Sequence, residues 1–342
     1  MAVVCACIVA LSHVGYNTAA GSAAWWFVRL SRYGLCCLAV PFFFAVSGYF
    51  LSRHFDESGW WLRETKKRVV SLLVPYLFWC LAFFLFMRIG SAMTQATAGK
   101  SFWAALRFPV AKLPVAFGLR LEATPLLVPA WYIRALFILV LVSPVVAWLA
   151  SCRGKWCWFL SVAASFCLYV AFSPHRNGLA STTAEHFLYY GFSLMGIAYF
   201  LTGVVLRKTG FLEKTLDGAR WLGVAMFAAG FAVLVWRVSG IAATGGEPFP
   251  VLCLAIPLLV AGVWFVVPSA PWPRWLTSMS FPIYVMHFFV IYAMDGFGGA
   301  RADKSVSAML SQAVISVMVP CAIALAMRRF APRIAAFLFG GR

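Results

Sequence analysis

Long runs of apolar residues constrain the fold of this 342-residue chain more than any other feature of its sequence. The runs are roughly 17–21 residues long, which is the helix length that crosses a hydrocarbon core about 30 Å thick. They do not alternate between apolar and polar residues, as transmembrane β-strands do. Only 11% of the residues are charged, against about 25% in soluble domains. The sequence therefore predicts an all-α, polytopic transmembrane helical bundle.

About ten such runs can be placed along the chain. Their expected bounds are 2–16, 35–51, 69–87, 130–150, 156–172, 186–206, 221–236, 251–267, 279–294 and 307–327. With the N-terminus in the cytoplasm, the cytoplasmic segments hold more Lys and Arg than the outer segments, in agreement with the positive-inside rule. We therefore expect both termini to be cytoplasmic.

The first run is unusually short before its only ionisable residue. Residues 2–12 precede His13, and as a helix they rise about 17 Å, which is roughly half of a bilayer. Either residues 14–20 complete the helix, or the first span is truncated at its N-terminus. In both cases we expect a single transmembrane domain over residues 1–342.

Charge and cysteine content exclude several classes of function. The formal net charge is +18, but most basic residues flank apolar runs, where they anchor helices, and no nucleic-acid-binding motif is present. The ten Cys residues are scattered and include no C-x-x-C pair. We therefore expect free thiols that pack as small apolar groups, no metal site and no nucleic-acid partner.

Two histidines lie inside apolar runs, His13 in the first and His287 in the ninth. Ionisable side chains within a span are costly and usually face a cavity or a partner. Histidine also accepts and returns a proton near neutral pH. Tyr284 precedes His287 by three residues, so the two share one helix face. For each histidine the alternative is a structural hydrogen bond between helices.

Three further features flank or interrupt the runs. Ser47 and Gly48 are small and let a neighbouring helix approach closely. Arg134 lies near the start of the fourth run, where it either snorkels to the outer surface or points inward to bind an anionic or glycan group. A basic cluster precedes the third run and either sets orientation or clamps phosphates. The basic cluster consists of Arg63, Lys66, Lys67 and Arg68.

Five segments, taken in order, resemble motifs of the acyltransferase-3 family, the integral-membrane O-acyltransferases that modify surface glycans. The resemblance covers nearly the whole chain. The segments are Leu11-Ser12-His13, residues 40–51, Lys67-Arg68 with residues 72–79, Pro129-Ala130-Trp131-Tyr132, and residues 280–287.

This resemblance implies an enzyme of the inner (cytoplasmic) membrane that transfers an acyl group, expected to be acetyl, to a hydroxyl of a glycan or lipid-linked sugar. Acetyl-CoA or another acyl-CoA would be a co-substrate on the cytoplasmic side, with no permanently bound cofactor. His13 matches the family's essential histidine and would act as general base or carry the acyl group. The basic cluster would bind the donor. The expected acceptor-side residues are Trp131, Arg134, Tyr284 and His287.

A function of another class also fits these residues. A secondary transporter or flippase of a glycan or lipid-linked sugar would use His13 and His287 as proton-relay groups. Such a protein needs a polar path through the bundle, whereas the runs of this chain carry few ionisable residues. The sequence does not identify the acceptor glycan, and it does not separate an acetyl donor from a succinyl donor.

Overall fold

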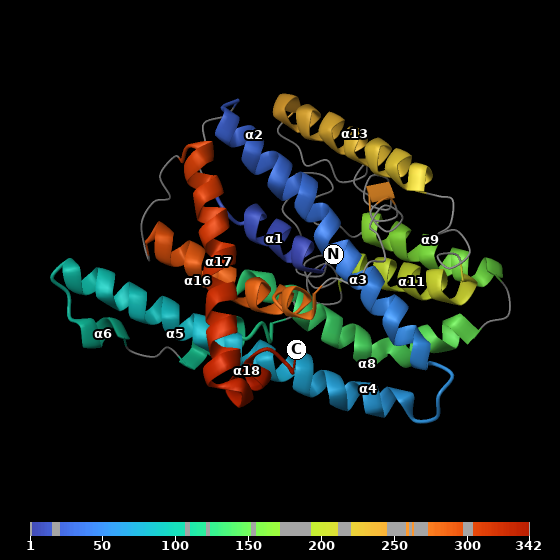
Figure 1. The fold of residues 1–342 in the computed structure, drawn as a ribbon, viewed down its shortest axis with the longest axis horizontal. Helices are drawn as coiled ribbons and strands as arrows, with labels where there is room; N and C mark the ends of the chain where they lie inside the picture. Colours follow the sequence, from blue (N-terminus) through green and yellow to red (C-terminus); the bar gives the residue numbers. More distant parts are fainter. Residues whose placement is uncertain are drawn as a thin grey trace. The chain divides into compact units, whose positions relative to one another are not determined.

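The computed structural model describes residues 2–15, 21–106, 110–120, 124–151, 155–171, 193–210, 220–244, 258, 259, 262, 273–296 and 304–341. Over these residues the secondary structure is helical and contains no strand, which confirms the predicted fold class (Figure 1). The chain forms two compact units. The first unit comprises Met1–Arg32, Val70–Arg134 and Trp272–Arg342, and the second comprises Tyr33–Val69 and Ala135–Pro271.

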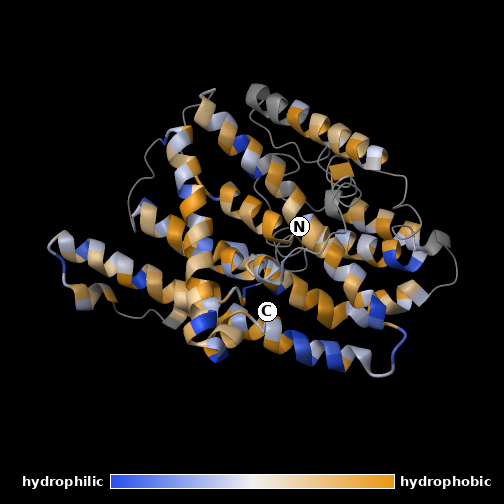
Figure 2. Cartoon of the chain, viewed as in Figure 1, coloured by the Kyte–Doolittle hydropathy of each residue, from blue (hydrophilic) through white to orange (hydrophobic). Residues whose placement is uncertain are grey.

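Three helical stretches of the described chain are long and apolar enough to cross a membrane: Trp60–Thr97, Val128–Ser151 and Val306–Phe330. Shorter apolar helices cover Ala2–Ser12, Trp158–Leu168, Trp221–Trp236 and Ser280–Asp295. The chain is thus a polytopic membrane protein, while the predicted number of about ten spans stays a prediction. The run expected at 251–267 lies almost entirely outside the described residues. Figure 2 shows apolar residues along most helices.

In the first unit, helix α16 (Ser280–Asp295) packs against both α1 (Ala2–Ser12) and α17 (Val306–Phe330). The unit also contains the beginning of α8 (Trp131–Ser151). Its other helices are α2 (Ala23–Arg29), α5 (Val74–Thr97), α6 (Phe102–Leu106), α7 (Leu113–Ala116), α15 (Arg274–Thr277) and α18 (Pro332–Leu338).

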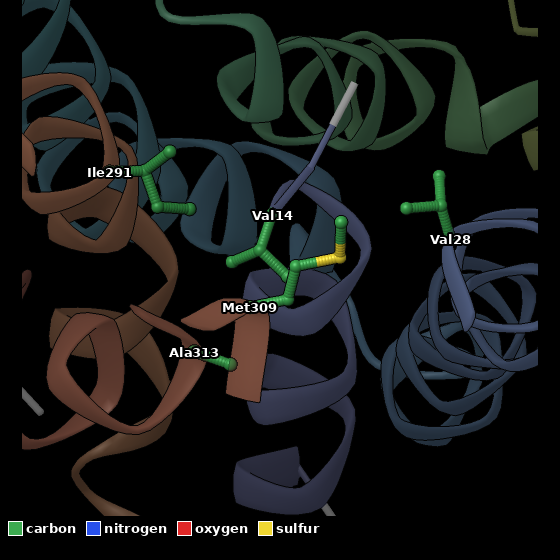
Figure 3. Packing of buried hydrophobic residues seen from close by; sticks show 5 residues of the cluster. All are labelled: Val14, Val28, Ile291, Met309 and Ala313. Carbon is green, nitrogen blue, oxygen red and sulfur yellow. The ribbon is translucent and has the colours of Figure 1, made fainter. Parts of the chain in front are cut away.

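A buried apolar cluster joins the end of α1 to α2, α16 and α17 (Figure 3). It consists of Val14, Val28, Ile291, Met309 and Ala313. Within it, Gly15 has a φ of +72°, a left-handed conformation that glycine adopts without strain. A Cβ atom there would lie 2.8 Å from Met309 Cε and 3.0 Å from Val28 Cγ2, and the left-handed φ would strain any other residue.

This glycine explains a correction to the first predicted span. The sequence predicted a run over residues 2–16, whereas α1 ends at Ser12, and the chain then turns at Gly15. Within this sequence α1 has 11 residues and a length of about 17 Å, and His13 directly follows its last residue.

In the second unit, α3 (Cys36–Leu51) packs along α11 (Leu194–Thr209), which also contacts α9 (Lys155–Ala171). A Cβ atom on Gly48 would overlap the carbonyl group of Phe200, and one on Gly203 would overlap that of Ala45. The two backbones thus meet at glycines on both helices, which confirms the close approach predicted at Gly48. The unit also contains η2 (Ser52–His54), α4 (Trp60–Arg68), most of α8, and α13 (Arg220–Thr244).

Helices α3 and α11 run in the same direction. Phe44 lies near Gly196, Gly48 near Phe200, and beyond the helix end Asp56 pairs with Lys208. The contacts advance together along both segments. Both helices therefore end on the same side of the unit, and their basic residues gather there.

Candidate active site

The two histidines that the sequence selected lie side by side in the first unit. The end of α1 presents His13 and the middle of α16 presents His287, and their ring centroids are 5.4 Å apart with an interplanar angle of 30°. The ring of His13 also meets the edge of Phe288 at a centroid distance of 5.1 Å. His13 is half-buried, so it is the more accessible of the two imidazoles.

His287 is fully buried, and one of its ring nitrogens is held by the backbone. Nδ1 lies 2.9 Å from the carbonyl oxygen of Ile283, one turn earlier on the same helix. A carbonyl only accepts hydrogen bonds, so Nδ1 carries the proton and Nε2 of the neutral ring is left as an acceptor. Within the described part of the chain, Nε2 is buried and has no hydrogen-bond partner.

Aromatic side chains from α5 and α16 surround one side of this pair. The ring of Phe83 lies 5.5 Å from that of Phe288, 4.9 Å from that of Phe289 and 5.5 Å from that of Tyr292. Such an apolar wall lowers the local dielectric and strengthens electrostatic interactions at the imidazoles. Sequence reasoning missed these rings, although Phe288 directly follows His287.

Tyr284 lies near His287 in space, and its hydroxyl already has a structural bond. The Tyr284 ring is 6.4 Å from that of His287, and its hydroxyl donates a hydrogen bond to the carbonyl of Pro129. This bond ties α16 to η5 (Val128–Ala130), the short turn that precedes α8. Trp131 begins α8 and is half-buried.

Arg134 is bonded to the segment that follows α7. Its side chain is buried, and Nη1 donates hydrogen bonds to the carbonyl of Gly118 at 2.5 Å and to that of Arg120 at 3.4 Å. The hydroxyl of Tyr76 donates to the neighbouring carbonyl of Phe117 at 2.6 Å. Arg134 thus holds the segment after α7 in place through charge-assisted hydrogen bonds.

The basic cluster lies on α4 in the second unit, and acidic residues partly neutralise it. Arg63 pairs with Glu57. The carboxylate of Glu64 is buried and lies 3.5 Å from Lys67 Nζ and 3.6 Å from Arg68 Nη2. The cations of Arg63, Lys66 and Lys67 are exposed to solvent. They form a hydrophilic surface, visible on α4 in Figure 2.

His54, next to the basic cluster, lowers the pKa of Glu57, the carboxylate that pairs with Arg63. His54 Nδ1 lies 2.8 Å from Glu57 Oε1. This hydrogen bond, followed by the charges of His54 and Arg63, holds the pKa of Glu57 below its usual value. Glu57 therefore remains an anion at neutral pH and keeps Arg63 directed toward the loop.

Two cations that sequence reasoning missed extend this surface at the end of α11. Arg207 Nη1 donates a hydrogen bond to the Tyr49 hydroxyl at 3.2 Å, and Lys208 Nζ lies 3.3 Å from the Asp56 carboxylate. Their position directly after the sixth apolar run is the sequence signal that could have identified them. No group of His, Cys, Asp and Glu side chains suited to a metal ion occurs among the described residues.

Comparisons with known proteins place the chain in a family. A family described as an acyltransferase domain matches residues 2–329. The succinoglycan biosynthesis protein ExoH of Rhizobium meliloti (strain 1021) is 29% identical over 247 residues, which cover 68% of this chain and 56% of that protein. The chain therefore spans just over half the length of this relative. No solved structure matches the chain.

Proposed function

The chain belongs to the acyltransferase-3 family, and from that premise we propose that it transfers an acyl group from an acyl-CoA to a hydroxyl of a glycan. The observation that carries this proposal is the pair of imidazoles at a 5.4 Å centroid distance, because group transfer to a hydroxyl needs a nucleophile or a base. The relative ExoH is named for the biosynthesis of succinoglycan, which supports a glycan acceptor.

We propose acetyl-CoA as donor, approaching from the cytoplasmic side of the inner membrane. The basic cluster would contact its phosphates, since Arg and Lys bind phosphate through charge-assisted hydrogen bonds. Arg63, Lys67 and Arg68 already pair with carboxylates, so a phosphate would compete with these for the cations. In this arrangement both chain termini are cytoplasmic, as the distribution of Lys and Arg predicts.

His13 is the residue that we place at the reacting carbonyl. As a general base, it takes the proton of the acceptor hydroxyl while the oxygen attacks the thioester carbon; the C–S bond breaks and the thiolate recovers that proton. As an acyl carrier, its ring nitrogen displaces the thiol first, and the acceptor oxygen then displaces the ring. Both routes consume one acyl-CoA and one hydroxyl and release one CoA.

The acceptor would contact residues close to the histidines and the start of α8. Tyr284 and Arg134 donate hydrogen bonds to backbone carbonyls, so we propose that they act by fixing the segments around Pro129 and Gly118. Trp131, which directly follows the first of these segments, offers an aromatic face against which a sugar ring can pack.

The test uses protein purified in detergent and radiolabelled acetyl-CoA. Wild-type protein is expected to release CoA, and His13→Ala is expected to lose this activity while its gel-filtration profile is retained. Ser316→Ala is the matched control, because it removes a buried hydrogen bond on α17 and neither imidazole. Wild-type rates in His13→Ala would contradict the assignment. If wild-type protein bound no acyl-CoA but moved a lipid-linked sugar across vesicles, the flippase alternative would replace it.

A further inference from the structure

The sequence-based hypotheses do not explain why the Nε2 atom of His287 is buried without a hydrogen-bond partner among the described residues. A structural histidine was expected to bridge two helices, yet its Nδ1 hydrogen bond goes to Ile283 on its own helix. Nε2 is buried and has no hydrogen-bond partner among the described residues. Buried polar atoms are nearly always paired, so an unpaired acceptor beside a half-buried imidazole points to a group that arrives with the substrate.

We propose that His287 is a second catalytic residue, whose Nε2 receives the proton of the acceptor hydroxyl and passes it to His13. This rests on the proposed function, in the form in which His13 carries the acyl group. Three observations support the role: the 5.4 Å centroid distance between the rings, the backbone bond that fixes Nε2 as the acceptor, and the burial of that atom.

The chemistry balances over two steps. First, a ring nitrogen of His13 bonds to the thioester carbon, the C–S bond breaks, and the proton on the other ring nitrogen leaves with the thiolate as CoA. Second, the acceptor oxygen bonds to the acyl carbon as its proton moves to His287 Nε2. The C–N bond to His13 breaks, its electron pair returns to the ring, and His287 gives the proton to that ring. Both imidazoles are then neutral again.

In this mechanism His13 carries the acyl group and His287 transfers the proton. While His13 bears the acyl group, its acylated nitrogen cannot accept a proton, and its own leaving requires one. His287 supplies that proton after taking it from the hydroxyl. General-base assistance of this kind contributes about 10²–10⁴-fold to a rate. The arrangement therefore assigns His13 to both steps and His287 to the second step alone.

The variant that tests this is His287→Asn. Its side-chain amide N–H can occupy the place of Nδ1–H and keep the hydrogen bond to Ile283, while no atom replaces Nε2. With labelled acetyl-CoA, the variant is expected to form the acyl-protein as wild type does. Transfer to a glycan hydroxyl is expected to fall by about 10²-fold or more. Transfer to hydroxylamine is expected to stay within a few-fold of wild type, since this nucleophile attacks an acylimidazole without a base.

Each other outcome has a defined meaning. Glycan transfer at the wild-type rate in His287→Asn would overturn the proposal, and so would loss of acyl-protein formation with correct folding, since His287 would then serve the first step or the fold. Wild-type protein that transfers acetyl to the glycan with no acyl-protein intermediate would also overturn it, but would leave the acyltransferase function intact. Wild-type protein that does not turn over acetyl-CoA would contradict the proposed function itself.

Discussion

Replacing Gly48 with alanine is expected to destabilise the second unit, because the added methyl group has no space. The new Cβ would overlap the Phe200 carbonyl oxygen and lie 2.9 Å from its carbon and 3.1 Å from Phe200 Cα. These are backbone atoms of α11, so no side-chain rotation can relieve the overlap and the two helices must separate.

Two opposing effects set the change in the free energy of unfolding caused by Gly48→Ala. Overpacking of a well-packed contact costs about 1–3 kcal/mol, and a rigid backbone obstacle places Gly48→Ala near the top of that range. Alanine also stabilises the interior of a helix relative to glycine by roughly 0.5–1 kcal/mol. The net expectation is a loss of about 2 kcal/mol, which lowers the ratio of folded to unfolded protein by up to about 30-fold.

The assay is unfolding by SDS in mixed micelles, followed by tryptophan fluorescence. Ser47→Ala is the matched control, because it changes the adjacent residue without adding an atom and is expected to stay within about 0.5 kcal/mol of wild type. Gly203→Ala, which meets the Ala45 carbonyl, should resemble Gly48→Ala. The double variant should cost less than the sum, since one separation of the helices relieves both overlaps. Stability of Gly48→Ala at or above wild type would refute the packing argument.

Three other changes have defined expectations. Arg134→Met removes the donor to the Gly118 carbonyl, so the same assay should show a loss of about 2 kcal/mol; an unchanged midpoint would mean that the bond does not hold the segment. Asp295→Ala leaves the Lys304 cation without its buried carboxylate and should lower the free energy of unfolding by about 3 kcal/mol. A free energy of unfolding equal to that of wild type would contradict the pairing. Glu64→Gln frees two cations of the basic cluster, so equilibrium binding of acyl-CoA should tighten, and weaker binding would argue against a donor site there.

The candidate site was only partly visible in the sequence. His13 and His287 stood out because ionisable residues are rare in apolar runs, but they lie at opposite ends of the chain and nothing local joins them. Gly48 was identified correctly as a point of close approach, although its partner on α11 was not. Arg134 had two orientations open, and the carbonyls that accept its hydrogen bonds belong to a segment with no distinctive pattern.

The sequence by itself determined the class of fold, because long apolar runs without alternation satisfy their backbone polar groups in a membrane only as helices. It also selected the residue types for chemistry, through the cost of ionisable groups in such runs. Only the tertiary structure showed that α1 stops at Ser12 and that the chain adopts a left-handed conformation at Gly15. The pairing of the two imidazoles is likewise tertiary, because it comes from the packing of α1 against α16, and helix periodicity carries no information about which distant helix lies next to which.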